Sequence, residues 1–414
     1  MSKTILINCK AILPDRIVDN AAVGISGGKI IFIKQFELND KHDFDNSEYK
    51  IIDLCGSFLA PGYIDLHVHG GLGADFYDGG QDGIKAITNY FALYGTTTLF
   101  ATITTANLEQ MEKAMEDIIY FIENKSYSAG ASIGGLYVEG PFCNVKRKGT
   151  FKAEYLLMPD TALMEKWIKK YGKHLKFIGL APELEGSDEV IKLLKKNGIM
   201  PCIAHSDATY DETLKAVELG ATHVTHCYNA MSGLHHREPG IVGTLLTDPR
   251  VTTEIICDFH HVHPIAIKLL LTCKMAEKVC LITDAMRATG LPDGEYVISE
   301  QKAVLKDGQV KIGGTTLAGS VLTMEMAVKN VYKLGYDLTD VIQMATLTPA
   351  KIAGIDSEVG SIEIGKDADL IVLNDSLDVC ATLLKGKTWL INHSKKDDKI
   401  CKNLIKSGGI TYES

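Results

Sequence analysis

The chain has 414 residues, of which 46% are hydrophobic and 23% charged, and its formal net charge is -9. This composition is typical of a globular protein with a large core, and the negative charge argues against nucleic acid or an anionic membrane as the general partner. The first apolar run, ILINCKAIL, is too short and too interrupted for a signal peptide or a membrane span. Ten cysteines without CxxC spacing predict reduced thiols and a cytoplasmic protein.

Both ends of the chain contain short strand-like runs separated by Asp, Asn and Gly turns. Residues 1–59 contain TILINCKAIL, AAVGISG, KIIFIKQ and YKIIDL, and GSIEIG and ADLIVLN follow residue 355. We therefore predict a composite β-sandwich domain from residues 1–59 and 355–395. The lysine-rich residues 396–414 are expected to form a solvated C-terminal tail.

The residues between these ends, 60–354, alternate between apolar strand-like runs and amphipathic segments. In NLEQMEKAMEDIIYFIEN the apolar residues keep helical spacing after a capping box at Asn107 and Gln110. Repeated βα units form a parallel sheet, and the length is sufficient for eight units. We predict a (β/α)8 TIM-like catalytic barrel rather than an open sheet.

Five of the apolar runs end on a residue that can bind a metal ion. They are YIDLHVH ending at His69, IGGLYVE at Glu139, MPCIAH at His205, THVTH at His226 and VCLITD at Asp284. In a barrel of this type the carboxyl ends of the strands surround one mouth, so these side chains are expected to meet.

The pair His67 and His69 is weak evidence by itself, because a His-x-His sequence also arises by chance or as a core pair. Residues two apart in a strand point to the same face, so both imidazoles can reach one ion. A lone strand-end histidine is more often structural, but five such ends together predict a metal site. Imidazole and carboxylate ligands suit Zn²⁺ or Fe²⁺, with Mn²⁺ or Co²⁺ as alternatives.

Six motifs within this arrangement resemble those of a known family. They are HVHGG, VEGPF, AHSDATYDE, THCYNAMSGLHHREPG, LITDAMRATG and TTLAGS. Together they resemble the N-acetylglucosamine-6-phosphate deacetylases of the amidohydrolase superfamily, over nearly the whole chain. The resemblance implies a metal-bearing barrel with a β-sandwich made from both termini. It also implies hydrolysis of the acetamide of N-acetyl-D-glucosamine 6-phosphate to D-glucosamine 6-phosphate and acetate, in amino-sugar catabolism.

The resemblance assigns the family's metal ligands to Glu139, His205 and His226. In members that hold a second metal, the His-x-His pair supplies it, and both His67 and His69 are present here. One or two divalent ions per chain are therefore expected.

The family's general base and acid falls on Asp284. The alternative is an aspartate that caps a helix.

The resemblance also implies where an amino-sugar phosphate binds. The substrate-binding residues fall on Thr150, Asn229, Ala230, Arg237, His261, Leu317, Ala318 and Gly319. No GxxxxGK[ST] loop is present, so side chains must hold the phosphate. Because family members take some phosphate contacts from the neighbouring subunit, we expect a homodimer with the phosphate site near the subunit interface. Arg237 has the alternative of a surface ion pair with Glu238, and TTLAGS that of a turn into a helix capped by Ser320.

Five further histidines are expected to lie outside the ligand set. His223 lies an odd number of positions before His226, so in a regular strand it faces away from the metal. The other four lie in polar stretches and are expected to face solvent or to support the site indirectly: His235, His236, His260 and His263.

Two residues depart from the family pattern. Some members place a histidine that polarises the acetyl carbonyl where this chain has Phe151, which cannot donate a hydrogen bond. Either a second metal replaces that function or the acyl group is held differently. Phe259 stands where glycine is common, and its bulk is expected to reshape the phosphate end of the pocket.

Three other functions stay open. One is a deacetylase of another amino-sugar phosphate, such as N-acetylgalactosamine 6-phosphate. A second is a cyclic-amide hydrolase, although those members often bridge two metals with a modified lysine where this chain has Glu139. The third is a non-catalytic scaffold, for which loss of Asp284 or a ligand would be expected.

Overall fold

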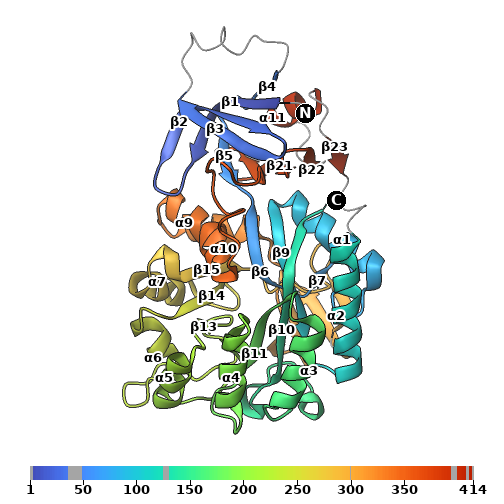
Figure 1. Ribbon diagram of the computed structural model, residues 1–414, viewed down its shortest axis with the longest axis vertical. Coiled ribbons are helices and arrows are strands. Elements are labelled where there is room, and N and C mark those ends of the chain that lie inside the picture. Colours follow the sequence, from blue (N-terminus) through green and yellow to red (C-terminus); the bar gives the residue numbers. More distant parts are fainter. Residues whose placement is uncertain are drawn as a thin grey trace.

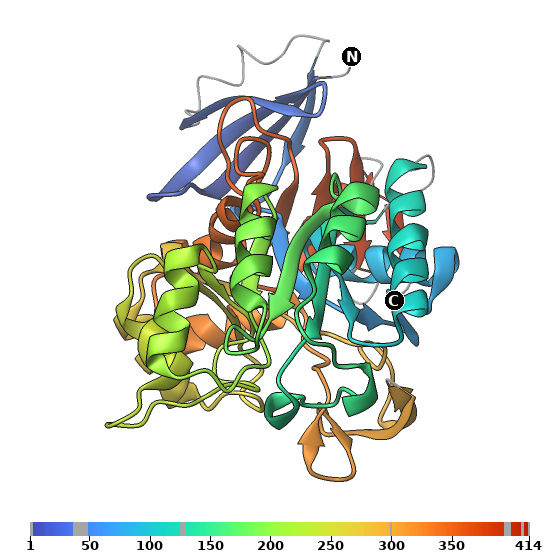
Figure 2. The same cartoon turned by 60° about the horizontal axis from the view of Figure 1, so that its bottom comes forward.

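The computed structural model describes residues 3–35, 49–124, 130–298, 300–392, 399–406 and 410–412. Within these residues a nine-stranded sheet lies at one end of the molecule, and an eight-stranded parallel sheet with its helices lies at the other (Figure 1). A small antiparallel sheet, seen as gold and orange hairpins in Figure 2, lies at the end of the barrel away from the nine-stranded sheet.

The nine-stranded sheet combines strands from both ends of the chain. It contains β1 (Lys3–Ile12), β2 (Ile17–Ser26), β3 (Lys29–Gln35), β4 (Tyr49–Asp53), β5 (Phe58–Pro61), β20 (Leu370–Leu373), β21 (Val379–Leu384), β22 (Thr388–Asn392) and β23 (Ile410–Tyr412). The two ends meet where β5 pairs antiparallel with β20, with Ala60 opposite Ile371. This confirms the small β-domain built from both chain ends, while its boundaries at residues 59 and 355 stay predictions.

Two expectations for the C-terminal part are wrong. GSIEIG is not a strand: residues 360–365 form bends, irregular chain and a turn, and the N–H of Gly365 donates to the carbonyl of Ile30. Residues 399–406 are not a solvated tail, because they form helix α11 (Lys399–Lys406), whose apolar face packs onto the nine-stranded sheet. The other parts of the predicted tail, residues 396–398, 407–409 and 413–414, lie outside the described residues, as do residues 393–395 of the predicted sandwich.

The eight parallel strands form the predicted barrel. They are β6 (Tyr63–Val68), β9 (Thr96–Thr104), β10 (Ser132–Phe142), β11 (Leu175–Leu180), β12 (Met200–Ile203), β13 (His223–Val224), β14 (Thr252–Ile256) and β15 (Val279–Ile282). The first and last strands meet through a bridge between Val68 and Ala285, and the N–H of Asp284 donates to the carbonyl of His67 at 2.9 Å. These contacts close the circle, so the TIM-like barrel is confirmed.

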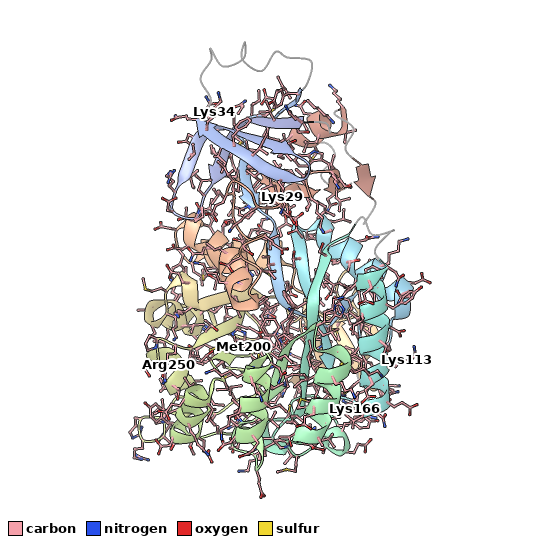
Figure 3. All side chains as sticks on the ribbon, viewed as in Figure 1. Lys29, Lys34, Lys113, Lys166, Met200 and Arg250 are labelled. Carbon is pink, nitrogen blue, oxygen red and sulfur yellow. The ribbon has the colours of Figure 1, made fainter. Side chains whose placement is uncertain are left out.

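Helices surround the barrel and bury their apolar stripes against it. They are α1 (Gly80–Leu93), α2 (Leu108–Glu123), α3 (Thr161–Tyr171), α4 (Ser187–Lys196), α5 (Tyr210–Leu219), α6 (Gly240–Thr247), α7 (Pro264–Cys273), α8 (Met324–Lys333), α9 (Leu338–Ala345) and α10 (Leu347–Ala353). The outer faces of α2 and α3 are charged: Lys113 on α2 and Lys166 on α3 project outward (Figure 3), and Lys166 pairs with Glu112 at 2.6 Å. None of the helices in the described ranges has the length and hydropathy needed to span a bilayer.

The predicted capping box of α2 is wrong in one half. The side chain of Asn107 caps the helix by accepting from the N–H of Glu109. The side chain of Gln110 does not return to the cap, because its Oε1 accepts from the hydroxyl of Tyr77 at 2.6 Å.

Short elements cover the mouth of the barrel. They are β7 (Gly70–Gly71), β8 (Ala74–Asp75), η2 (Val145–Arg147), η3 (Ala153–Tyr155), and the four strands β16 (Gly294–Ile298), β17 (Gln301–Lys306), β18 (Gln309–Ile312) and β19 (Thr316–Leu317). A further single turn, η4 (Ala276–Lys278), precedes β15. Sequence analysis did not predict the four-stranded sheet, which contributes Ile298, Thr316 and Leu317 to the pocket described below.

Candidate metal centre and active site

Three of the predicted ligands meet at one point of the barrel mouth. Oε1 of Glu139 lies 3.0 Å from Nε2 of His205 and 2.9 Å from Nε2 of His226, and the two imidazole nitrogens are 3.3 Å apart. All three side chains are buried. A carboxylate oxygen and two ring nitrogens at this spacing form a group able to hold a metal ion.

The His-x-His pair forms a second group beside the first. Nε2 of His67 and Nε2 of His69 are 3.2 Å apart, so both rings point the same way, as the strand period predicts. Nε2 of His69 lies 3.2 Å from Oε2 of Glu139. One carboxylate oxygen of Glu139 therefore faces His205 and His226, and the other faces His69. Glu139 thus belongs to both possible metal groups.

Three site residues have strained backbone conformations. His205, His226 and Asp284 follow the ends of β12, β13 and β15 with φ angles of 46°, 26° and 49°. Side chains rarely adopt this left-handed region, which costs of order 1–3 kcal/mol per residue and is concentrated at functional sites. The sharp turns end each strand and direct these side chains across the mouth.

Asp284 lies next to the histidine pair. Its Oδ1 is 3.3 Å from Nε2 of His69 and 3.6 Å from Nε2 of His67. The main chain holds it on both sides, since its N–H donates to His67 and its carbonyl accepts from Ser320 at 2.8 Å. Asp284 does not cap a helix, so it remains available to a ligand in the pocket.

The charged groups of the site perturb one another's protonation. Burial alone would raise the pKa of Glu139, but hydrogen bonds from His205 and His226 outweigh it and hold that pKa well below its ordinary value. Burial would likewise raise the pKa of Asp284, and the charges of His67 and His69 lower it below the ordinary value. Both acids are therefore carboxylates near neutral pH, which is the form that binds a cation or accepts a proton.

The imidazoles are oriented from behind in different ways. Nδ1 of His67 lies 3.0 Å from Oε2 of Glu254, and Nδ1 of His205 donates to the carbonyl of Arg147 at 2.8 Å. Nδ1 of His226 is buried without a hydrogen-bond partner in the structure. For His67 and His205 the contact on Nδ1 sets which ring nitrogen faces the site.

A pocket of about 340 Å³ opens over both groups. It is lined by His69, Glu139, His205, His226 and Asp284 together with predicted substrate residues, which are Thr150, Asn229, Ala230, His261, Leu317, Ala318 and Gly319. The volume is within the range of about 300–1,000 Å³ that small-molecule sites occupy. Nδ1 of His261 contacts Oδ2 of Asp258 at 2.6 Å, which leaves Nε2 as the ring nitrogen available to a ligand.

Arg237 is the one predicted substrate residue that does not line this pocket. It is exposed on the loop between β13 and α6, where its guanidinium contacts Nε2 of His236 at 2.7 Å. The alternative ion pair with Glu238 is absent from the contacts of these two described residues. Within one chain, Arg237 is therefore not part of the site.

The two departures from the family pattern have different consequences. Phe151 lines the pocket, and its ring centroid lies 4.4 Å from that of His205. Phe259 does not line the pocket, so the expectation that its bulk reshapes the phosphate end is wrong. Its side chain packs against the main core instead, and its φ of 65° explains why glycine would suit this position.

Ser320 does not cap a helix, because α8 begins at Met324 and Thr323 caps it. Ser320 instead accepts from the N–H of Leu322 at 2.9 Å and donates its own N–H to the carbonyl of Asp284. The TTLAGS segment therefore ties the strand end that carries Asp284 to the pocket wall.

Sequence reasoning missed three charged residues of the site. Lys146 and Arg147 line the pocket, and the signal for them was the run KRK that follows VEGPF. Glu254 lies behind His67 on β14. A single glutamate in the strand-like run TTEII was the only signal for that buried carboxylate.

The five further histidines considered above lie outside the ligand groups, as predicted. Nε2 of His223 lies 3.2 Å from Oε1 of Glu254, away from Glu139. The four histidines of the polar stretches are exposed: His235, His236, His260 and His263. The side chain of His263 caps α7 by accepting from the N–H of Ile265.

A family model described as "Amidohydrolase family" matches residues 58–397. The chain belongs to the amidohydrolase family. Members of this family are metal-dependent, and the donor set of this amidohydrolase, imidazoles and carboxylates without thiolate, suits a divalent cation.

Individual relatives of this amidohydrolase are deacetylases. It is 38% identical to N-acetylglucosamine-6-phosphate deacetylase of Vibrio furnissii, over 80% of this chain and 82% of the relative. It is also 38% identical to N-acetylgalactosamine-6-phosphate deacetylase of Escherichia coli O157:H7, over 80% of this chain and 87% of the relative. The crystal structure of N-acetylglucosamine-6-phosphate deacetylase from Pasteurella multocida matches with a TM-score of 0.87 and 30% identity, over 94% of this chain and 100% of that chain.

Proposed function

We propose that this amidohydrolase hydrolyses the acetamide of N-acetyl-D-glucosamine 6-phosphate to D-glucosamine 6-phosphate and acetate, in amino-sugar catabolism. The observation that carries the proposal is the shared position of Glu139 between two histidine pairs, with the carboxylate of Asp284 beside one of them. The identity to named deacetylases supports the substrate class.

We propose that Glu139, His205 and His226 hold one divalent ion and that His67 and His69, with the other oxygen of Glu139, hold a second. Zn²⁺ and Fe²⁺ suit these ligands best, and Mn²⁺ and Co²⁺ are alternatives. A metal bound there lowers the pKa of water toward about 7 and polarises the amide carbonyl.

Asp284 is the proposed general base and acid. Its carboxylate takes a proton from the attacking water as the oxygen–carbon bond forms. When the carbon–nitrogen bond breaks, the same carboxyl group delivers that proton to the amide nitrogen, so the neutral amine and acetic acid form and Asp284 is regenerated. The remaining acid proton then passes to the amine, which gives acetate and the protonated amine. Its lowered pKa favours the first step by keeping the group ionised before water attacks.

The phosphate end of the substrate is proposed to lie near His261, Asn229 and Ala230, with Thr150 and the loop 317–319 holding the sugar. These residues line one continuous pocket with the ligand groups. Lys146 and Arg147 on the pocket wall both pair with Asp207, and their side chains are the proposed source of positive charge for a dianionic phosphate.

We propose a homodimer in which Arg237 reaches the phosphate site of the neighbouring subunit. Arg237 is exposed three positions after Leu234, which is 56% exposed, and α7 presents Ile265 and Leu269 at 65% and 45%. Exposed large apolar residues support an interaction surface in this part of the chain. Sedimentation should give a dimer mass, and Arg237→Ala should raise KM for the phosphorylated substrate; a monomer with wild-type KM after this change would contradict the proposal.

The second candidate is a deacetylase of N-acetylgalactosamine 6-phosphate. It is favoured by the 38% identity to the relative of that name, which equals the identity to the Vibrio furnissii enzyme. A cyclic-amide hydrolase is less well supported, because Glu139 rather than a lysine joins the two groups. A non-catalytic scaffold is also less well supported, because Asp284 and all five candidate ligands are present.

Acetate release from purified protein tests these candidates. The protein is incubated with each hexosamine phosphate, with and without a chelator, and acetate is measured over time. We expect release from N-acetylglucosamine 6-phosphate that stops on chelation and returns with added metal. Faster release from the galactosamine isomer would favour the second candidate, and release from neither would refute both. We further expect the enzyme to act in the cytoplasm, because its cysteines show no paired spacing.

A further inference from the structure

Glu254 is a fully buried carboxylate directly behind the candidate metal centre. It lies on β14, and its Oε2 is 3.0 Å from Nδ1 of His67 and accepts from the N–H of His226 at 3.1 Å. Its Oε1 lies 3.2 Å from Nε2 of His223. One carboxylate therefore contacts three histidines, two of which belong to different ligand groups.

The contact with His67 determines which nitrogen of that ring is available. A carboxylate at Nδ1 requires a proton there, so the lone pair is on Nε2, which faces His69 and Asp284. The other ligand imidazoles have weaker support, because His205 donates to a main-chain carbonyl and His226 has no partner on Nδ1. Among the three, His67 alone is held by a charged group.

His223 extends the support behind Glu254. Nδ1 of His223 lies 2.8 Å from Oγ1 of Thr252, and its Nε2 faces Oε1 of Glu254. Both oxygens of the buried carboxylate are thereby partnered, as a charge at this depth requires. The orientation of His67 is therefore imposed by a chain of contacts inside the barrel, independent of the pocket surface.

We propose that Glu254 is a positioning residue that gives the His67 and His69 site its affinity for a divalent cation. The proposal rests on the proposed metal centre and adds a residue that does not touch substrate. A negative charge behind a ligand imidazole increases the electron density that the ring offers to a cation, and loss of such a partner typically weakens metal binding about 10–100-fold.

Replacement of Glu254 by glutamine tests the charge without changing the shape. The amide can still accept from His67 through its oxygen and donate through its nitrogen, so the volume and hydrogen bonds are retained while the charge is lost. Glu325 provides a matched control, because it is also a buried glutamate, lies on helix α8 rather than on a barrel strand, and accepts from the N–H of Val379 at 2.8 Å.

The experiment titrates metal-free protein with Mn²⁺ and records bound metal and the electron paramagnetic resonance spectrum. We expect two ions in the wild type, with the exchange-coupled signal of an adjacent pair. In Glu254→Gln the second ion should bind about 10–100-fold more weakly and the coupled signal should be lost, while the first ion binds as before. Glu325→Gln should behave as the wild type.

The other outcomes would contradict either the role of Glu254 or the metal centre itself. Two ions bound normally in Glu254→Gln would overturn the role of Glu254, as would equal weakening of both ions together with a lower melting temperature. A wild type that binds only one ion would also overturn it, whereas a wild type that binds none would refute the metal centre itself. If the glutamine variant does not fold, Glu254→Asp keeps the charge but shortens the reach to His67; selective weakening of the second ion then supports the proposal, and unchanged binding overturns it.

Discussion

Oδ1 of Asp284 lies 3.3 Å from Nε2 of His69, at the edge of the candidate metal centre. The proposed base is therefore beside the ligand group that only some family members retain, rather than at the group formed by Glu139, His205 and His226. This placement connects the acid–base step to the histidine pair.

Replacement of Asp284 by asparagine should separate catalysis from metal binding. Asparagine keeps the shape and the main-chain contacts with His67 and Ser320 but cannot take a proton at neutral pH. We expect acetate release to fall by about 10²–10⁴-fold, the usual contribution of general acid–base catalysis, while bound metal stays nearly unchanged.

Asp375→Asn is the control for this prediction, because Asp375 is 87% exposed and pairs only loosely with Lys10 among the described residues. It should leave both acetate release and metal content unchanged. Substantial turnover by Asp284→Asn would remove Asp284 from the acid–base role, and loss of metal in parallel with activity would make it a ligand instead.

Metal affinity should increase with pH and then level off. Burial would lower the pKa of His69, but Asp284 and Glu139 outweigh it and raise that pKa from 6.5 to about 9 in the metal-free protein. Below about pH 9 a cation must displace this proton, so apparent affinity rises with pH until His69 is deprotonated. Calorimetric titration with Zn²⁺ in buffers of different ionisation enthalpy should detect the released proton, and an affinity independent of pH between 6 and 9 would contradict the expectation.

The raised pKa of His69 should make the metal-free protein less stable as pH increases, whereas metal affinity increases with pH. A histidine whose pKa is raised by folding stabilises the folded state, fully so below 6.5, and this contribution is lost as pH rises through about 9. Thermal melts of metal-free protein should therefore show lower stability at pH 9 than at pH 6. His69→Asn should flatten this dependence.

The ligand groups could be predicted from two features that the sequence shows. The alternation of side chains along a strand indicates which residues share a face, and the barrel fold brings the carboxyl ends of the strands together. His69, Glu139, His205, His226 and Asp284 each follow an apolar run, and the closed barrel brings those ends together. The positive φ angles that direct three of these side chains leave no mark in the sequence pattern.

Residues whose neighbours are distant in sequence were harder to predict. Glu254 appears as one polar residue within TTEII, and only the closure of the barrel, which brings β6 next to β15, places it behind His67. Ser320 precedes a helix in the sequence but contacts the strand end at Asp284, because the four-stranded sheet sets where that segment enters the mouth. Helix α11 was not predicted, because the lysines of this segment suggested a solvated tail and its few apolar residues were not recognised as a buried face.

Gly140 should be essential for placing Glu139. Its φ is 108°, and a Cβ added there would lie 2.0 Å from Oγ1 of Thr105, which donates to the carbonyl of Glu139 at 2.6 Å. Gly140→Ala therefore combines backbone strain with a clash, and we expect a loss of about 2–4 kcal/mol in the free energy of unfolding, with weaker metal binding.

Gly313→Ala is the matched control, because Gly313 has a φ of 60° but its Cβ would meet nothing within 4 Å. It should lose only the strain, about 1–2 kcal/mol, and bind metal normally. Urea unfolding of both variants measures the difference. Equal losses would show that contact with Thr105 is unimportant.

Phe151 should make this enzyme dependent on the His67 and His69 site. The phenyl ring packs on His205 in the pocket but cannot polarise the acetyl carbonyl, so a second metal is the remaining candidate for that function. His67→Asn should therefore reduce kcat/KM by about 10²-fold or more.

Adding Phe151→His to that variant should recover about 10²-fold, the usual contribution of one donor to a developing oxyanion. In the wild-type background the same histidine should have a much smaller effect, because the function is already supplied. The four kcat/KM values form a double-mutant cycle, and additive effects would show that Phe151 and His67 act independently.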